Sequence, residues 1–102
     1  MHKIKVIIKD PGQKPRCVNI SASLENLQKT VGGYIETVTL CSDLVVICDE
    51  EGRIKGKPHC CTISGADFVG TIILAGAEND EFADIPCDYK DIRRLLPTVW
   101  EE

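Results

Sequence analysis

Two groups of residues in this chain are of types that could do chemistry: the soft donors His59-Cys60-Cys61 and the acids Asp49-Glu50-Glu51. Imidazole and thiolate groups are the usual ligands of zinc, and a zinc site needs about four of them. A remote Cys41 or Cys87 would therefore have to complete such a site. Because the spacing also lacks the C-x-x-C pair typical of zinc sites, we expect the chain to hold no metal and no cofactor.

The same soft donors could supply a nucleophilic thiolate. Cys60 or Cys61 would then need His59 beside it in space as the base. Since adjacent residues on a strand point to opposite faces, we do not expect this arrangement, and we nominate no catalytic residue. Cys48, by contrast, lies in a continuous apolar run and is predicted to be a small core residue.

The acids follow an apolar run, where carboxylates could hold a cation or act as acid and base. A hydrolase that uses Asp49 and Glu50 is therefore one alternative. An acidic turn that ends in Gly52 is also what a hairpin requires, and this is the interpretation we prefer. The chain has no P-loop, G-x-G-x-x-G, H-E-x-x-H or G-x-S-x-G motif, so we do not expect an enzyme.

The elements that must position these residues are mainly strands. Apolar residues alternate with lysines over residues 3–9, which predicts a half-buried strand whose lysines face solvent. Residues 44–49 are apolar at nearly every position, so we expect both faces of that strand to be covered. The predicted strands cover residues 3–9, 16–20, 34–40, 44–49, 60–63 and 70–76.

Two helices are predicted. Leu24, Leu27 and Val31 recur at helical spacing, Ser21 or Ser23 can cap this helix, and Gly32-Gly33 ends it. In the second helix the apolar residues are Ile92, Leu95 and Leu96, Asp88 can cap its start, and Pro97 ends it.

With 102 residues, of which 43% are apolar, the chain is expected to form a single domain over residues 1–102. We predict an α+β fold with a mixed or mainly antiparallel sheet of five or six strands. Both helices are expected to cover one face of that sheet.

A helix that ends in two glycines and leads into a two-strand hairpin, over residues 24–52, is the most distinctive run of the chain. Together with the strand at residues 3–10 and the run 68–76, it resembles the DUF3846 family, uncharacterised small proteins of Firmicutes and their phages and plasmids. The resemblance covers most of the chain. It implies a fold and a genomic setting but no reaction.

The net charge is −4, and acids gather at residues 49–51, 78–81 and 101–102. This charge argues against general nucleic-acid binding, which usually needs a basic face. No segment approaches the roughly 20 apolar residues that cross a bilayer. We expect a soluble cytoplasmic protein with no membrane partner, whose six cysteines are reduced. Assembly into a homo-oligomer stays open.

The function we expect is that of a non-enzymatic accessory protein of a mobile element. It would bind a host protein or a small molecule, for example by sequestering a nucleotide-type immune signal. The ligand-binding residues would then be Tyr34 for stacking, Thr71 for a hydroxyl hydrogen bond, and Arg53 or Lys57 for phosphate. Besides the hydrolase, a structural metal protein and a protein-interaction module that uses the acidic surface stay open.

Overall fold

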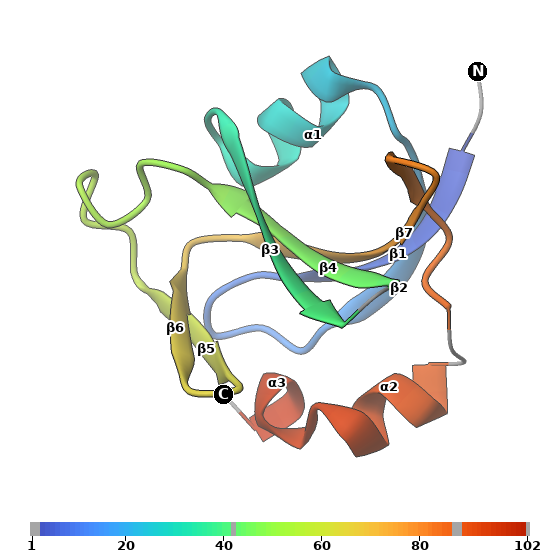
Figure 1. The fold of residues 1–102 in the computed structure, drawn as a ribbon. Helices are drawn as coiled ribbons and strands as arrows, with labels where there is room; N and C mark the ends of the chain where they lie inside the picture. Colours follow the sequence, from blue (N-terminus) through green and yellow to red (C-terminus); the bar gives the residue numbers. More distant parts are fainter. Residues whose placement is uncertain (1–2, 42, 87–88, 102) are drawn as a thin grey trace.

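The computed structural model describes residues 3–41, 43–86 and 89–101, and the strand pairings among them are all antiparallel. The main sheet runs in the order β2 (Arg16–Ser21), β1 (Lys3–Lys9), β7 (Ile72–Glu78), β4 (Leu44–Asp49) and β3 (Ile35–Cys41), and β8 (Glu81–Ala83) pairs with the end of β7 (Figure 1). A separate hairpin consists of β5 (His59–Ile63) and β6 (Ala66–Val69). The predicted α+β fold in a single domain is confirmed.

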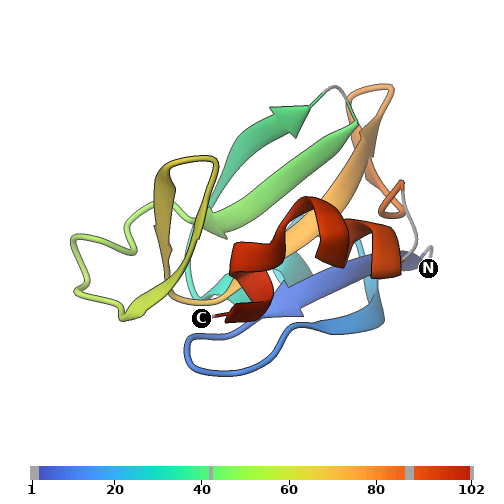
Figure 2. The same ribbon diagram turned by 90° about the horizontal axis from the view of Figure 1, so that it is seen from below.

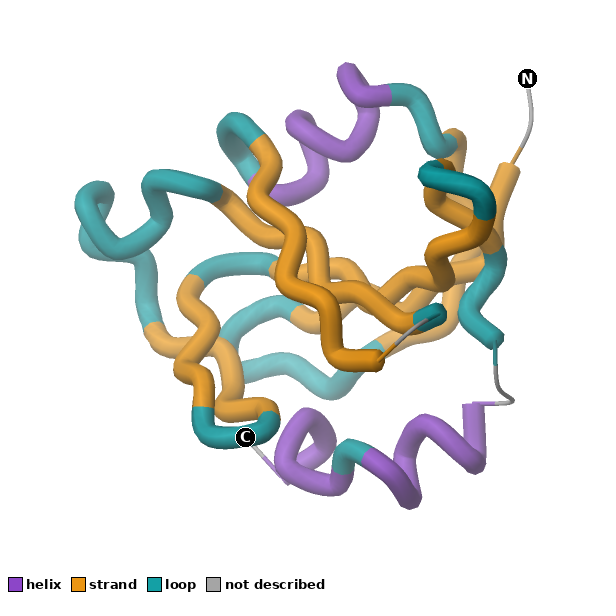
Figure 3. Tube along the Cα trace, viewed as in Figure 1, coloured by secondary structure: helices purple, strands orange, loops and turns teal. Residues whose placement is uncertain are grey.

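The sheet is covered on both faces. The helix α1 (Leu24–Val31) packs on one face, and the β5–β6 hairpin packs with α2 (Tyr89–Leu95) and α3 (Pro97–Glu101) on the other (Figures 1 and 3). The prediction that both helices cover the same face is wrong. Because β4 is buried along its whole length, each of its faces needs its own covering layer.

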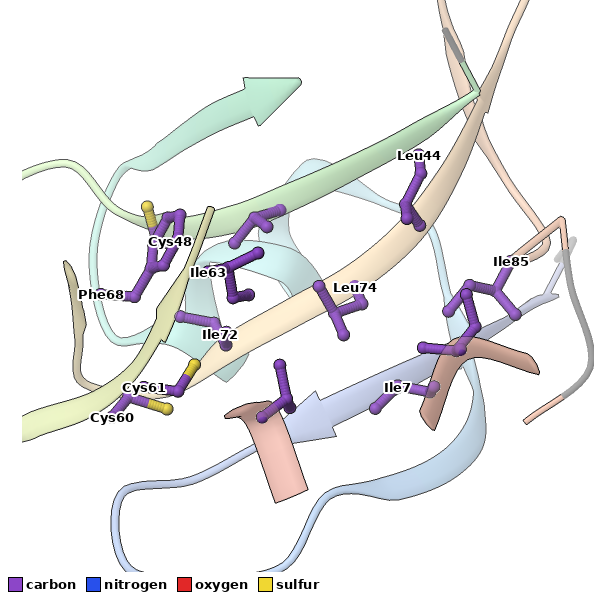
Figure 4. Packing of buried hydrophobic residues seen from close by; sticks show 13 residues of the cluster. Ile7, Leu44, Cys48, Cys60, Cys61, Ile63, Phe68, Ile72, Leu74 and Ile85 are labelled. Carbon is purple, nitrogen blue, oxygen red and sulfur yellow. The ribbon is translucent and has the colours of Figure 1, made fainter. Parts of the chain in front are cut away.

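Each covered face has its own group of buried side chains. The upper core, on the α1 side, includes Val45, Ile47 and Ile73. The lower core, on the hairpin side, includes Val46, Leu74 and Phe68 (Figure 4). The alternation between the two cores along β4 and β7 follows from the period of two in a strand.

Local sequence signals set the ends of α1. Ser23 is the N-cap, and its Oγ accepts a hydrogen bond of 3.2 Å from the backbone N–H of Asn26. Gly32 is the C-cap with φ of 82°, in the left-handed region that glycine enters without a Cβ clash. The helix therefore begins and ends within the predicted bounds.

Three local predictions need correction. The strand expected at residues 70–76 instead covers Ile72–Glu78. The strands β6 and β8 were not predicted. The predicted second helix is divided into two short helices, since α2 ends at Leu95 and α3 begins at Pro97. Residues 42 and 88, which fall in a predicted turn and a predicted cap, lie outside the described residues.

Lys9 also differs from its prediction. Its side chain was predicted to face solvent, yet the residue is 0% exposed, and its Nζ donates to the carbonyl oxygen of Asp10 at 3.0 Å. The β5–β6 hairpin covers this end of β1, because the Cys60 thiol donates to the carbonyl oxygen of Lys9 at 3.5 Å. The alternation of β1 stops where this second layer begins.

Among the described residues, no helix has the length and apolarity needed to span a membrane.

Candidate functional site

A buried acid and two lysines meet where β4 ends. The side chain of Asp49 is 1% exposed, and its Oδ2 lies 2.7 Å from Lys57 Nζ and 2.9 Å from Lys55 Nζ. The backbone N–H of Glu51 donates to Oδ1 of Asp49 at 2.9 Å. We call Asp49, Lys55 and Lys57 the Asp49 network.

The electrostatics of the Asp49 network favour the ionised carboxylate. Burial alone would raise the pKa of Asp49, but the hydrogen bonds from Lys57, Lys55 and the Glu51 backbone outweigh it and lower the pKa to about 2. Both lysines also reach the end of α1, where Lys57 Nζ donates to the carbonyl oxygen of Val31 at 2.7 Å and Lys55 Nζ to that of Gly32 at 3.1 Å. Positive charge at a helix C-terminus is favourable because the last carbonyls carry partial negative charge.

Gly33 makes this close approach possible. A Cβ on Gly33 would lie 2.5 Å from Asp49 Oδ1 and 2.7 Å from Lys55 Nζ. The two glycines after α1 thus have separate roles, since Gly32 supplies the left-handed cap and Gly33 supplies the space for the network. The sequence interpretation gave both of them the capping role.

This geometry gives Asp49 a structural role. A general base needs a pKa near the working pH and access to a substrate proton, whereas Asp49 is enclosed and its pKa is low. Glu50, the other acid of the hydrolase alternative, lies exposed at the start of the loop 50–57. The Asp49 network therefore holds this loop against α1, and its arrangement does not favour hydrolysis.

The loop 50–57 is further held by backbone hydrogen bonds of its own. The amides of Lys55 and Lys57 donate to the carbonyl oxygens of Glu51 and Gly52, both at 3.0 Å. At its tip, Ile54 is 85% exposed. Tyr34, 66% exposed, lies at the same end of the molecule, because its carbonyl oxygen accepts a hydrogen bond of 2.8 Å from the Glu50 amide.

A shallow hollow lies beside the loop, between β3, the end of β4 and β6. Its volume is about 200 Å³, and its lining includes Glu36, Val38, Cys48, Arg53 and Phe68. The Arg53 guanidinium donates to the carbonyl oxygen of Asp67 at 2.6 Å. Ligand pockets usually measure roughly 300–1,000 Å³, so this hollow is small for a nucleotide.

The profile of the DUF3846 family, described as a domain of unknown function, matches residues 4–96. The chain belongs to the DUF3846 family. No curated protein and no solved structure matches it. The Asp49 network and the hollow both fall within the matched part of this DUF3846 chain, but the family supplies no activity for them.

The four predicted ligand-binding residues of this DUF3846 protein do not share one pocket. Arg53 alone among them lines the hollow, and Lys57 belongs to the Asp49 network. Tyr34 is exposed nearby. The Thr71 hydroxyl donates to Asp10 Oδ1 at 2.6 Å, and Asp10 Oδ2 forms an ion pair with Arg16 at 2.6 Å. The hydroxyl of Thr71 is therefore already engaged in a hydrogen bond within the protein.

The soft donors are also divided between core and surface. A shift of register between His59 and Cys61 directs both Cys60 and Cys61 into the lower core (Figure 4), where they are 1% and 0% exposed. Both thiols can lie on the same side because a bulge interrupts the alternation of the strand. The His59 ring is on the surface, 3.6 Å from an Asp67 carboxylate oxygen.

Within the described residues, no three His, Cys, Asp or Glu side chains gather as metal ligands would. The pKa of the Cys60 thiol is raised, chiefly by the hydrogen bond with Cys61 and next by burial. A raised pKa disfavours the thiolate, which is the form that binds metals and attacks electrophiles.

Sequence reasoning missed three residues of this region, namely Lys55, Ile54 and Glu36. Lys55 and Lys57 stand two residues apart in a loop that follows Asp49, and this pattern could have indicated the Asp49 network. An isolated isoleucine between charged residues, in Arg53-Ile54-Lys55, was a usable signal for an exposed apolar contact.

Proposed function

We propose that this DUF3846 protein is a non-enzymatic binding protein whose partner is another protein, and that it serves as an accessory factor of a mobile element. The observation that carries the proposal is the exposure of two large apolar side chains, Ile54 and Tyr34, at the end of the molecule that holds the Asp49 network. Large apolar side chains of this kind are the usual anchors of protein interfaces.

The Asp49 network should strengthen binding through Ile54 and Tyr34. A loop that is already held in place loses less conformational freedom on binding than a mobile loop would. Here the ammonium groups of Lys55 and Lys57 tie the loop 50–57 to the carboxylate of Asp49 and to α1. Ile54 is therefore presented by a pre-organised turn.

A small-molecule ligand is the less favoured form of this proposal. A nucleotide-type signal would need free cationic groups for its phosphates. The guanidinium of Arg53 already donates to the Asp67 carbonyl oxygen, and both lysines contact the Asp49 carboxylate. The acids Glu36 and Glu50 also line the hollow, which would repel an anion.

Affinity capture with matched variants tests the proposal. Wild-type protein, the double variant Tyr34→Ala with Ile54→Ala, and the control Leu24→Ala are each incubated with cell extract. Leu24 is a suitable control because it is an exposed apolar residue on α1, 58% exposed. Bound proteins and released small molecules are then quantified separately by mass spectrometry.

We expect one protein to be captured by the wild type and by Leu24→Ala, and to be lost with the double variant. Its purified form should then bind the wild type in calorimetry, with an affinity loss of about tenfold or more for the double variant. Release of an unmodified small molecule in near-stoichiometric amount, or turnover of a metabolite, would contradict the proposal.

A further inference from the structure

The edge strand β3 has backbone groups that face outward. Among the described strands, β3 pairs with β4 alone. The amide of Glu50 donates to the carbonyl oxygen of Tyr34 at 2.8 Å. Tyr34 and Glu50, which lie opposite each other, are therefore a hydrogen-bonded pair of the antiparallel ladder. Since hydrogen-bonded and non-hydrogen-bonded pairs alternate in an antiparallel ladder, the N–H and C=O groups of Ile35, Thr37 and Thr39 point away from β4.

The first part of the β3 edge, from Ile35 to Thr39, carries little of the usual protection among the described residues. Natural edge strands are blunted by charged side chains, especially lysine, by proline, by a β-bulge or by a covering segment. The sequence of β3, IETVTLC, contains neither lysine nor proline. The register of β3 shifts only near its end, between Thr39 and Cys41, so within the described residues the stretch from Ile35 to Thr39 is regular. In Figure 2 the strand lies on the outer side of β4, toward the upper left of the molecule. By contrast, the Arg53 guanidinium covers the Asp67 carbonyl oxygen on β6. Of these two neighbouring strands, β3 is the one left open to a partner strand.

The charges beside this edge indicate the chemistry of the partner. Val38 and Leu40 pack against the lower core, so Glu36, which shares their side of β3, lies next to the hollow. Glu50 lines the same hollow, and the one arginine in its lining already donates to a carbonyl oxygen. A basic side chain placed here would meet Glu36 and Glu50. The net charge of −4 would also favour encounter with a basic partner.

We infer that the partner contributes an extended segment that adds to the main sheet beside β3 and places a lysine or arginine next to Glu36 at the hollow. This inference rests on the proposed function and names the chemistry of the partner. Main-chain hydrogen bonds to Ile35, Thr37 and Thr39 would supply affinity, and the basic side chain would supply specificity.

Short synthetic strands test this inference. The probes are peptides of alternating valine and threonine that carry a central arginine, glutamine or glutamate, with alternate amides N-methylated on the outer edge to prevent self-association. Amide hydrogen exchange of the protein is followed by NMR as each peptide is added. The amides of Glu36 and Val38, which point toward β4, are the internal control because they are protected in the free protein.

We expect the arginine peptide to slow exchange at Ile35, Thr37 and Thr39, and to bind about five- to tenfold more tightly than the glutamate peptide. Glu36→Gln should remove most of this preference. Thr37→Pro should abolish binding of every peptide, because it removes an outward N–H without removing a bond to β4. Thr37→Val keeps that N–H and should bind as the wild type does.

Three results would overturn the inference, two from hydrogen exchange and one with the natural partner. One is slow exchange at Ile35, Thr37 and Thr39 in the protein alone that depends on protein concentration, since a second copy would then cover the edge. The second is the absence of protection with every peptide although Thr37→Val and the wild type are folded. If the natural partner still binds Thr37→Pro but not the Tyr34 and Ile54 double variant, the strand inference fails while the proposed function stands.

Discussion

Lys57 Nζ lies 2.7 Å from Asp49 Oδ2 and 2.7 Å from the carbonyl oxygen of Val31, so one ammonium group joins the end of β4 to the end of α1. Val31 and Lys57 are far apart in the chain, and this contact fixes the loop 50–57 relative to the helix. The stability of the fold and the shape of the proposed interface therefore depend on the same carboxylate.

Replacement of that carboxylate should be costly. Asp49→Asn leaves Lys55 and Lys57 without a counter-charge, and we expect the free energy of unfolding to fall by about 3 kcal/mol, at the low end for a broken buried ion pair. Urea denaturation followed by circular dichroism measures it. The exposed neighbour provides the control, since Glu50→Gln should change stability by less than about 0.5 kcal/mol. Equal stability of the two variants would contradict a structural role for Asp49.

Stability should also fall in acid. The pKa of Asp49 is lowered from 3.8 to about 2 in the folded protein. Because the folded value lies below the unfolded one, its contribution is full above about pH 5 and is lost as the pH falls through about 4 to 2. The contribution amounts to about 2 kcal/mol. The difference in stability between wild type and Asp49→Asn, measured across this range, should shrink toward low pH; a constant difference would show that the carboxylate is not responsible.

Gly33 should tolerate no side chain. Gly33→Ala places a Cβ 2.5 Å from Asp49 Oδ1, and we expect a loss of about 2–3 kcal/mol from this overpacking. Gly56→Ala is the matched control, because its φ is +72° and no atom lies within 4 Å of its added Cβ. That variant should lose only about 1–2 kcal/mol from backbone strain. Thermal denaturation of both variants separates the two costs, and a milder effect at Gly33 than at Gly56 would contradict the close approach.

A charge in the lower core should unfold the protein. Val46 is 0% exposed and lies between Val38 on β3 and Leu74 on β7. Val46→Asp buries an unpaired carboxylate at a cost of several kcal/mol, comparable with the whole stability of roughly 5–15 kcal/mol. Thr39→Asp, at an exposed position of the neighbouring strand, should stay folded. A soluble Val46→Asp protein with a near-native melting temperature would refute the internal position of β4.

Thiol reactivity should follow burial. Cys17 and Cys41 are exposed, whereas Cys48, Cys60 and Cys61 are buried. Burial raises the pKa of Cys48 to about 11, and the hydrogen bond with Cys61 together with burial raises that of Cys60. We expect iodoacetamide to label Cys17 and Cys41 in the native protein and to label the buried thiols only after unfolding. Peptide mass spectrometry assigns each label, and rapid native labelling of Cys60 or Cys61 would contradict the packed lower core.

Much of the local structure could be predicted from patterns within a few residues. The apolar run at residues 44–49 predicted a strand covered on both faces, and β4 has these bounds. Ser23 and Gly32 were among the predicted ends of the helix and are its caps. These predictions succeeded because capping and strand alternation depend on neighbours along the chain.

The tertiary structure alone decided which distant residues meet. Patterns along the chain were enough to predict most of the strands, the capped helix and an aliphatic interior, whereas they left open a mixed or a mainly antiparallel sheet. The amino-acid sequence by itself did not determine that α1 and the carboxy-terminal helices lie on opposite faces, that a bulge turns Cys60 and Cys61 inward, or that Lys9 is buried. Nor did it bring Lys55 and Lys57 to Asp49 and to α1. The physical reason is that these contacts depend on how whole layers pack to bury both faces of the sheet, and packing joins segments whose separation in the chain carries no local signal.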